Sequence, residues 1–320
     1  PSFNGSGQVI GAARIYKWSG TEWSQIGSRI DGSVDFEGLG TSISLNVSAT
    51  DSVLVVGSPD MESTTSADDY AGRVTIYRHS EGSWGGTWSS PDVLIGSPYD
   101  YFGATVSLSA DMERVAIGAP IHFLAFENFV GTVKVFDYDG SDWLQLGASI
   151  SSMEGDGTPV DFDGFGTSVS LSSDGSYVAI GAPGSVAEIN PNGRAEIYSW
   201  SGSAWAMVGD SIPGMNENSS FGSSVAIASD GGTVAIGAPT DQTTANGLAQ
   251  TFEYVLPNSA PVITASQSFD ISENAANNTS LGTVLATDVN EETTFSSWTI
   301  TAGNSAGVFA INGTTGELTV

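Results

Sequence analysis

Cysteine is absent from this chain of 320 residues, histidine occurs twice, and basic residues are scarce: eight lysines and arginines face 36 aspartates and glutamates. The lack of cysteine excludes disulfide bonds but leaves secretion open. The net charge of −28 repels nucleic acid and anionic lipid, so neither is expected as a partner. Such acidity suits cation binding or salty surroundings, or it simply keeps the surface soluble.

Long hydrophobic runs and catalytic signatures are also missing. No stretch of 18 apolar residues is present, so we expect no direct membrane insertion by this segment. There is no phosphate-binding loop, no His-Glu-x-x-His motif and no zinc-ligand spacing, and neither His79 nor His122 lies in a recognisable motif. Carboxylate pairs carry little information in so acidic a chain. These absences predict a protein that is not an enzyme.

Repetition is what the chain has in abundance. A Phe-Gly pair is followed by Ile-Gly-Ala-Pro, and the Phe and the second Gly are 16 positions apart. Three copies of this frame begin at Phe102, Phe165 and Phe221, and a looser copy begins at Leu39. A period of about 60 residues indicates an array or a propeller, in which each repeat is one supersecondary unit.

One repeat contains two predicted hairpins. Residues 167–171 alternate polar and apolar, Asp174-Gly175 is a strong turn signal, and residues 177–180 form an apolar return strand. A second hairpin follows, with strands over 193–200 and 205–209. Four antiparallel strands joined by short turns make one propeller blade. The sequence therefore predicts an all-β fold, a β-propeller of four-stranded antiparallel blades.

The Phe-Gly…Gly-Ala-Pro frame resembles the FG-GAP repeats of integrin α-subunit propellers and of related bacterial and algal surface proteins, over residues 1–256. In that family many blades carry an Asp-rich calcium loop between the first two strands. Here that turn is too short, so blade calcium sites are not expected. The sequence supplies three full blades, three strands at 221–256 and two strands near the N-terminus. We therefore expect a truncated propeller whose missing blades precede Pro1.

A change of pattern at 257–261, where two prolines fall within five residues, predicts a linker. The segment from 258 to 320 resembles a cadherin-like repeat, an antiparallel β-sandwich, and stops before the last strands of that fold. The predicted domains are thus 1–256 and 257–320. The resemblance implies that Glu273 and Asp288 bind Ca²⁺, with Asn290 where the family usually has a second acid; carboxylate oxygens suit this ion. The alternative is ordinary acidic turn residues.

Two further segments are candidate sites. Asp161 and Asp163 precede the third repeat and could hold a cation, or they are simple turn residues. The loop after the second Gly-Ala-Pro is apolar where its siblings are polar. Such a loop marks a partner site if it is exposed, or it folds inward over the central channel. The residues concerned are Ile121, Phe123, Leu124, Phe126 and Phe129.

Seven of the eight tryptophans lie in or beside the second hairpins, where cross-strand packing explains them and sugar stacking is an alternative. Taken together, we expect a non-enzymatic adhesion or structural protein at the cell surface or outside the cell. It would present propeller loops to a protein partner or to another copy, with the cadherin-like unit as a spacer. The alternative is a glycan-binding or receptor-binding module of a bacterial adhesin or a virus. An enzyme with paired carboxylates is the third candidate.

Overall fold

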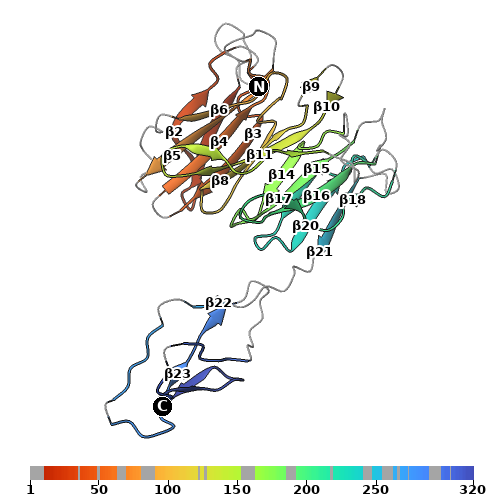
Figure 1. Ribbon diagram of the computed structural model, residues 1–320. Helices are drawn as coiled ribbons and strands as arrows, with labels where there is room; N and C mark the ends of the chain where they lie inside the picture. Colours follow the sequence, from red (N-terminus) through yellow and green to blue (C-terminus); the bar gives the residue numbers. More distant parts are fainter. Residues whose placement is uncertain are drawn as a thin grey trace. The chain divides into compact units, whose positions relative to one another are not determined.

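A computed structural model gives the structure of the chain in two compact units, Pro1–Tyr254 and Val255–Val320, which are taken separately (Figure 1). All regular structure in the described residues is β-strand, which confirms the predicted all-β class. No helix among them is long and apolar enough to cross a membrane. The described residues are 11–34, 37–48, 51–62, 70–80, 91–121, 123–125, 128–152, 163–184, 192–216, 219–240, 247–253, 262–264, 267–272, 274–287, 297–302 and 304–320.

Three antiparallel sheets, one of four strands and two of five, follow one another in the first unit, and each corresponds to one predicted blade (Figure 1). Blade 1 consists of β3 (Ser42–Val47), β4 (Asp51–Ser58), β5 (Arg73–Ser80) and β6 (Asp92–Ile95). Blade 2 consists of β7 (Thr105–Leu108), β8 (Arg114–Ala119), β11 (Thr132–Tyr138), β12 (Trp143–Gln145) and β13 (Ile150–Ser151). Blade 3 consists of β14 (Ser168–Leu171), β15 (Tyr177–Ala182), β16 (Arg194–Trp200), β17 (Trp205–Met207) and β18 (Ile212–Pro213).

Two incomplete sheets flank these blades. Among the described residues, the N-terminal half-blade contains β1 (Ala12–Trp18) and β2 (Trp23–Asp31), and blade 4 contains β19 (Ser224–Ile227), β20 (Thr233–Ala238) and β21 (Leu248–Glu253). This strand order agrees with the sequence-based one. The fourth strand differs in detail, because in blades 2 and 3 it is split into two short pieces. Gly147 and Gly209 lie at the breaks with positive φ angles of 73° and 67°, which turn the chain out of the ladder.

The repeated glycines bring the backbones of neighbouring blades into contact. The Gly of Gly-Ala-Pro in one blade faces the carbonyl oxygen of the Phe-Gly glycine in the next. A Cβ atom on the first glycine would lie closer than 3.0 Å to that oxygen, so no larger residue fits without moving a backbone. The three contacts are Gly57 with Gly103, Gly118 with Gly166, and Gly181 with Gly222.

Serines on the innermost strands fix the same junctions with hydrogen bonds. Ser42 Oγ donates to Gly103 O at 2.7 Å, and Ser168 Oγ donates to Gly222 O at 2.8 Å. Two positions further along the inner strand, Ser44 Oγ accepts from the amide of Leu108 at 3.1 Å. These bonds run from one blade to the next, so the first strands of successive blades lie side by side as in a propeller.

The core lies between the blades. Phe102, Phe165 and Phe221, the aromatic residues of the frame, are at most 1% exposed and each packs among strands of two adjacent blades. Each such burial contributes about 2–3 kcal/mol. The frame therefore combines a large side chain that fills the space between blades with glycines that let the blades approach.

Buried ion pairs recur at one end of the blades. The acid two residues before the frame aromatic is buried and pairs with a base on the third strand of the same blade. In blade 4 the equivalent residue is Ser219, and the third strand has neither Lys nor Arg. The three pairs are Glu37 with Arg73 at 2.6 Å, Asp100 with Lys134 at 3.0 Å, and Asp163 with Arg194 at 2.6 Å.

The blade 3 pair belongs to a larger network. Arg194 also pairs with Glu196 at 2.8 Å, and Tyr198 donates its hydroxyl to the same carboxylate at 2.8 Å. Burial lowers the pKa of Arg194, but the charges of Asp163 and Glu196 outweigh it and raise that pKa above its usual value. The buried guanidinium is thus charged and ion-paired with two carboxylates.

The second unit is built of two small antiparallel sheets. One pairs β22 (Val262–Ile263) with β24 (Ala286–Thr287), and the other has the order β23 (Ser280–Thr283), β26 (Glu317–Thr319), β25 (Ala310–Ile311). The turn before β26 places Gly316 against the ring of Trp298. The cadherin-like assignment of this unit stays a prediction.

The glycine contact predicts a contrast between two alanine variants. Gly181→Ala should lower the free energy of unfolding by about 2–3 kcal/mol, because the new methyl group meets the backbone of Gly222. Gly237→Ala is the matched control: it holds the same place in blade 4, and its added Cβ meets only the exposed, rotatable Ser224. Denaturant titration of both variants measures the difference. Equal losses would show that the junction does not depend on backbone contact.

The buried network predicts a second contrast. Arg194→Ala should cost about 3–5 kcal/mol of unfolding free energy, because it leaves two carboxylates buried without a counter-charge. Arg29→Ala removes an arginine whose pair with Asp31 is exposed, and should cost less than about 1 kcal/mol. Chemical denaturation at pH 7 compares the two. A cost for Arg194→Ala as small as that for Arg29→Ala would contradict the network's role.

Candidate functional site

A cluster of aromatic and acidic side chains lies at the junction of blades 1 and 2. Three segments meet there: the turn after β4 carries Asp60, the residues before β5 carry Tyr70, and the residues before β7 carry Tyr101. The Tyr101 amide donates to Tyr70 O at 3.1 Å, and the next amide, that of Phe102, donates to Ala71 O at 3.2 Å. This short ladder fixes the two tyrosines beside each other. We call Asp60, Tyr70 and Tyr101 the tyrosine site.

The two tyrosine rings are stacked. Their centroids are 5.4 Å apart and their planes differ by 8°. Tyr70 and Tyr101 both have left-handed backbones, with φ angles of 40° and 53°. The same positive φ recurs at this position in every blade: the residue is glycine in blades 1 and 3, where it is free of strain, and Ser220 in blade 4, with a φ angle of 52°. A tyrosine there costs about 1–2 kcal/mol, and strain of this kind concentrates at functional sites.

Asp100, which directly precedes Tyr101, anchors this part of the backbone. Its carboxylate is fully buried, accepts from the amide of Ser97 at 2.9 Å and pairs with Lys134 at 3.0 Å. The repeated buried ion pair therefore has a second consequence in blade 2, because it anchors the residue directly before Tyr101.

Asp60 adds an ionisable group to this surface. Its carboxyl lies over Gly38, and partial burial raises the pKa of Asp60 above its ordinary value. Burial also raises the pKa of the Tyr101 phenol, and the charges of Tyr70 and Asp60 add to that effect. Within the described chain, no hydrogen bond or ion pair engages the Asp60 carboxylate. The site thus offers a flat aromatic surface, two phenol hydroxyls and an acid that is protonated more readily than usual.

The expected cation sites have different outcomes. Asp163 pairs with Arg194, accepts from Ser152 Oγ and accepts from the Phe165 amide at 2.9 Å, so both of its oxygens have partners. Its neighbour Asp161 lies outside the described residues. Glu273, Asp288 and Asn290 lie outside them as well, so calcium at these positions stays a prediction. Among the residues that are described, no three His, Asp or Glu side chains form a metal-binding group.

The apolar loop of blade 2 forms a small hairpin. β9 (Phe123–Ala125) pairs with β10 (Asn128–Phe129) antiparallel, with a bulge between the two pairs. Ile121, at its start, is 40% exposed. Phe126 lies outside the described residues, and for Phe123, Leu124 and Phe129 only the backbone is described. The role of this loop as a partner site stays a prediction.

The described tryptophans of the second hairpins differ in burial: those of blades 2 and 3 pack against the preceding blade, and those of the N-terminal half-blade are exposed. Trp143 is buried in the core between blades 1 and 2, and the Trp205 indole N–H donates to Leu146 O of the preceding blade at 3.0 Å. The rings of Trp18 and Trp23 in the half-blade have centroids 5.6 Å apart and planes tilted by 54°, and the two residues are 50% and 67% exposed. Trp143 and Trp205 thus pack on the preceding blade and also pair across their hairpins with Tyr138 and Trp200. Trp84 and Trp88 of blade 1 lie outside the described residues.

Sequence reasoning did not identify the tyrosine site. The one available signal was the residue before the frame aromatic, which is Gly, Gly and Ser in the sibling repeats and Tyr101 in blade 2. Tyr70 and Asp60 fall in loops of variable length, where the repeat gives no alignment, so no pattern marked them.

Comparison with known proteins gives fold-level matches only. No protein-family model and no curated protein matches the chain. Among solved structures it is similar to an α-L-arabinofuranosidase from Fusarium graminearum in complex with an iminosugar inhibitor, at 13% identity and a TM-score of 0.42, covering 75% of this chain and 67% of that one. It is also similar to a periplasmic gluconolactonase from Pseudomonas aeruginosa, at 16% identity and a TM-score of 0.40, covering 79% and 69%.

These matches correct the expected function. A non-enzymatic adhesion protein was expected partly because repeated blades mostly present surfaces, yet the similar solved structures are enzymes. The expectation that the chain is not an enzyme is therefore wrong in its premise: a propeller-type repeat does not argue against catalysis. At these identities and TM-scores, the likeness concerns the fold alone and transfers no substrate and no residue.

Proposed function

We propose that the tyrosine site binds a neutral saccharide. The observation that carries this proposal is the parallel stacking of Tyr70 on Tyr101, two partly exposed aromatic rings held in left-handed backbone conformations. Aromatic faces provide flat apolar area for the C–H face of a sugar ring, and nearby phenol and carboxyl groups satisfy its hydroxyls. Tyr70 is 37% exposed and so accessible to a ligand.

The charge of the chain selects the kind of saccharide. With a net charge of −28, the surface repels sulfated, phosphorylated or uronic-acid polymers. Neutral sugars avoid this repulsion, and their hydroxyls can donate to the Asp60 carboxylate. A glycan partner was suggested first by the tryptophans, but Trp143 of blade 2 and Trp205 of blade 3 are packed between blades, so the tyrosine site is the better platform.

We also propose a family for each of the two domains. A propeller of FG-GAP type followed by a cadherin-like, calcium-binding unit would be an extracellular or surface-displayed protein, where saccharide polymers are abundant. The Phe-Gly…Gly-Ala-Pro frame and the strong acidity support this assignment. Saccharide binding itself rests only on the tyrosine site and does not require it.

Asp60 supports a second candidate function, hydrolysis of a bound glycoside. A general acid must be protonated near working pH and lie beside the substrate, and enzymes achieve this by partial burial of a carboxyl. Asp60 has a raised pKa from burial and borders the proposed sugar platform. In this candidate function Asp60 gives its proton to the glycosidic oxygen as the bond from that oxygen to the anomeric carbon breaks. Water adds to the anomeric carbon and releases a proton to solvent, from which Asp60 is protonated again.

Saccharide binding is tested by replacing the strained tyrosine with the residue its siblings have. Tyr101→Gly should change the free energy of unfolding by less than about 1 kcal/mol, because relief of backbone strain offsets the lost ring stacking. Affinity for neutral oligosaccharides, found on a glycan array and measured by calorimetry, should fall about tenfold or more. Tyr16→Ala, at an exposed tyrosine on β1, is the control and should bind normally. Unchanged affinity of Tyr101→Gly would refute the proposal.

Hydrolysis is tested with chromogenic aryl glycosides across a pH series. The reaction requires the protonated form of Asp60, whose pKa is raised by burial. The rate should therefore be highest below that pKa and fall as the pH rises through it. Asp60→Asn should lower the rate about 10²- to 10⁴-fold and remove this limb of the profile, while saccharide affinity changes little. A chain that binds sugars but shows no Asp60-dependent turnover would retain the binding function and reject the catalytic one.

A further inference from the structure

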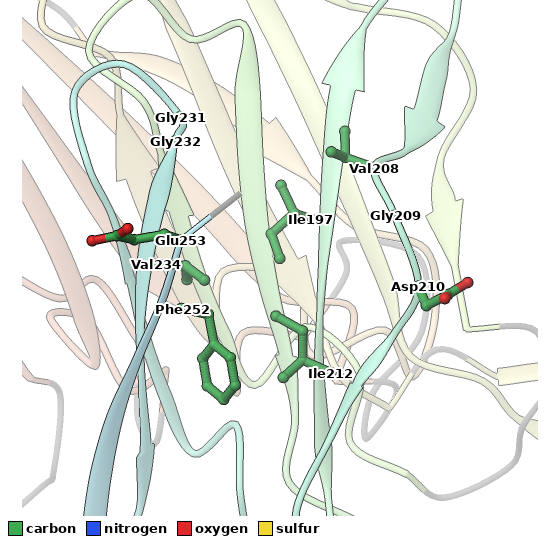
Figure 2. Close-up of a pocket in the computed structure, with 10 residues that line it drawn as sticks. All are labelled: Ile197, Val208, Gly209, Asp210, Ile212, Gly231, Gly232, Val234, Phe252 and Glu253. Atoms are coloured by element: carbon green, nitrogen blue, oxygen red, sulfur yellow. The ribbon is translucent and has the colours of Figure 1, made fainter. Parts of the chain in front are cut away.

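An apolar slot of about 200 Å³ opens between blade 3 and blade 4. In Figure 2, Ile197, Val208 and Ile212 of blade 3 face Val234 and Phe252 of blade 4 across this space. Gly231 and Gly232, in the turn between β19 and β20, also line the slot. The slot is therefore a gap at the junction of two blades. The corresponding positions at the junctions of blades 1 with 2 and 2 with 3 show which side chain fills such a gap.

Strand register identifies the corresponding position in the complete blades. In blade 4, Phe252 pairs with Val234. In blade 3 the equivalent pair is Tyr198 with Val178, and in blade 2 it is Phe136 with Val115. In blades 2 and 3 the third strand also pairs with a fourth strand that begins with tryptophan, Trp143 in β12 and Trp205 in β17.

These tryptophans fill the corresponding gap against the preceding blade. The Trp205 ring packs in the core between blades 2 and 3, and its indole N–H donates to Leu146 O at 3.0 Å. Trp143 is 7% exposed and packs in the core between blades 1 and 2. Val208 is the counterpart of Leu146, since each follows the fourth-strand Trp by three residues and each donates its amide to the third strand. Val208 lines the slot, and no backbone amide of the described residues donates to its carbonyl.

Blade 4 also presents a free strand edge. Its described sheet has the order β19-β20-β21, so β21 is paired on one side only. An exposed strand edge takes up an extended peptide through main-chain hydrogen bonds, and pockets for alternate side chains give specificity. In blades 2 and 3 the fourth strand pairs with the third strand and places its tryptophan against the preceding blade. In blade 4 the β21 edge corresponds to the first of these two contacts, and the slot corresponds to the second.

We propose that the slot and the β21 edge bind an extended segment of a partner polypeptide that carries Trp and, three residues later, an aliphatic residue. The indole would fill the slot and donate to the Val208 carbonyl, and the segment would complete blade 4. A second copy does not supply this segment from its described strands, because its own Trp-first strands are already paired: β2 with β1, β12 with β11 and β17 with β16. This inference is independent of saccharide binding.

Charge at the rim refines the partner. Asp210 and Glu253 lie on opposite sides of the slot, and both carboxylates point away from its apolar centre in Figure 2. Basic residues flanking the Trp would therefore be attracted, and acidic ones repelled. The preferred segment is an apolar strand with Lys or Arg at its ends.

The test uses the full chain and a ten-residue peptide with the sequence of residues 201–210, Ser-Gly-Ser-Ala-Trp-Ala-Met-Val-Gly-Asp, with two lysines added at each end. Calorimetry should show saturable binding that falls at least about tenfold when the peptide carries the Trp205→Ala change. Hydrogen exchange should show new protection at alternate amides of β21. Equal affinity of the two peptides, or binding without protection of β21, would overturn the proposal.

Protein variants localise the binding to the slot. Val208→Asp places a charge on the slot wall and should abolish binding, whereas Met207→Asp adds the same charge to an exposed neighbour and should not. If Val208→Asp fails to fold, the comparison of the two peptides on the unaltered chain decides the question alone. A chain that dimerises by sedimentation and excludes the peptide would assign the slot to a second copy and overturn the partner-strand proposal.

Discussion

The contact between two glycine backbones at each blade junction is the constraint on which the rest of this structure depends. Gly118 and Gly181 lie so close to the next blade that even a methyl group has no room. Once those backbones touch, the inner strands lie side by side, their serines reach across, and the frame phenylalanines are enclosed between two sheets. A repeat that keeps these glycines can vary nearly everything else, which explains why the loops at the blade ends differ so widely in length and polarity.

That freedom at the blade ends is where function can develop. The acid that precedes the frame aromatic is buried and paired in three blades, and in blade 2 this anchored residue, Asp100, directly precedes Tyr101. A rigid junction can hold a backbone conformation that a mobile loop would relax, so the stacked tyrosines stay in their strained arrangement. The scaffold interaction and the candidate site are thus neighbours in sequence, and the stability of one supports the geometry of the other.

The sequence predicted the blades well and the candidate site poorly, for a physical reason. Backbone contact leaves a periodic trace, because only glycine satisfies it at every turn of the repeat, and period and strand order could be inferred from it. The ion pairs left a weaker trace. The acids Glu37, Asp100 and Asp163 each lie two residues before the start of the frame, but the position of the base varies: Arg73 is the first residue of its strand, and Lys134 is the third residue of its strand. The stacking of Tyr70 on Tyr101 joins two loops that follow no period, so only the folded chain brings them together.

The two ends of the array present complementary halves of the same junction. On the inner strand of blade 1, Ile43, Leu45 and Val47 are 40–59% exposed, whereas their counterparts Val106 and Leu108 in blade 2 are at most 8% exposed against blade 1. In the described part of the chain, the half-blade consists of β1 and β2, and no inner strand of it covers these side chains. At the other end, Gly237 has the place of a junction glycine with no blade backbone against it among the described residues. One end exposes side chains that need a cover and the other exposes a surface that accepts such side chains, so the geometry of the internal junctions defines what each end can bind.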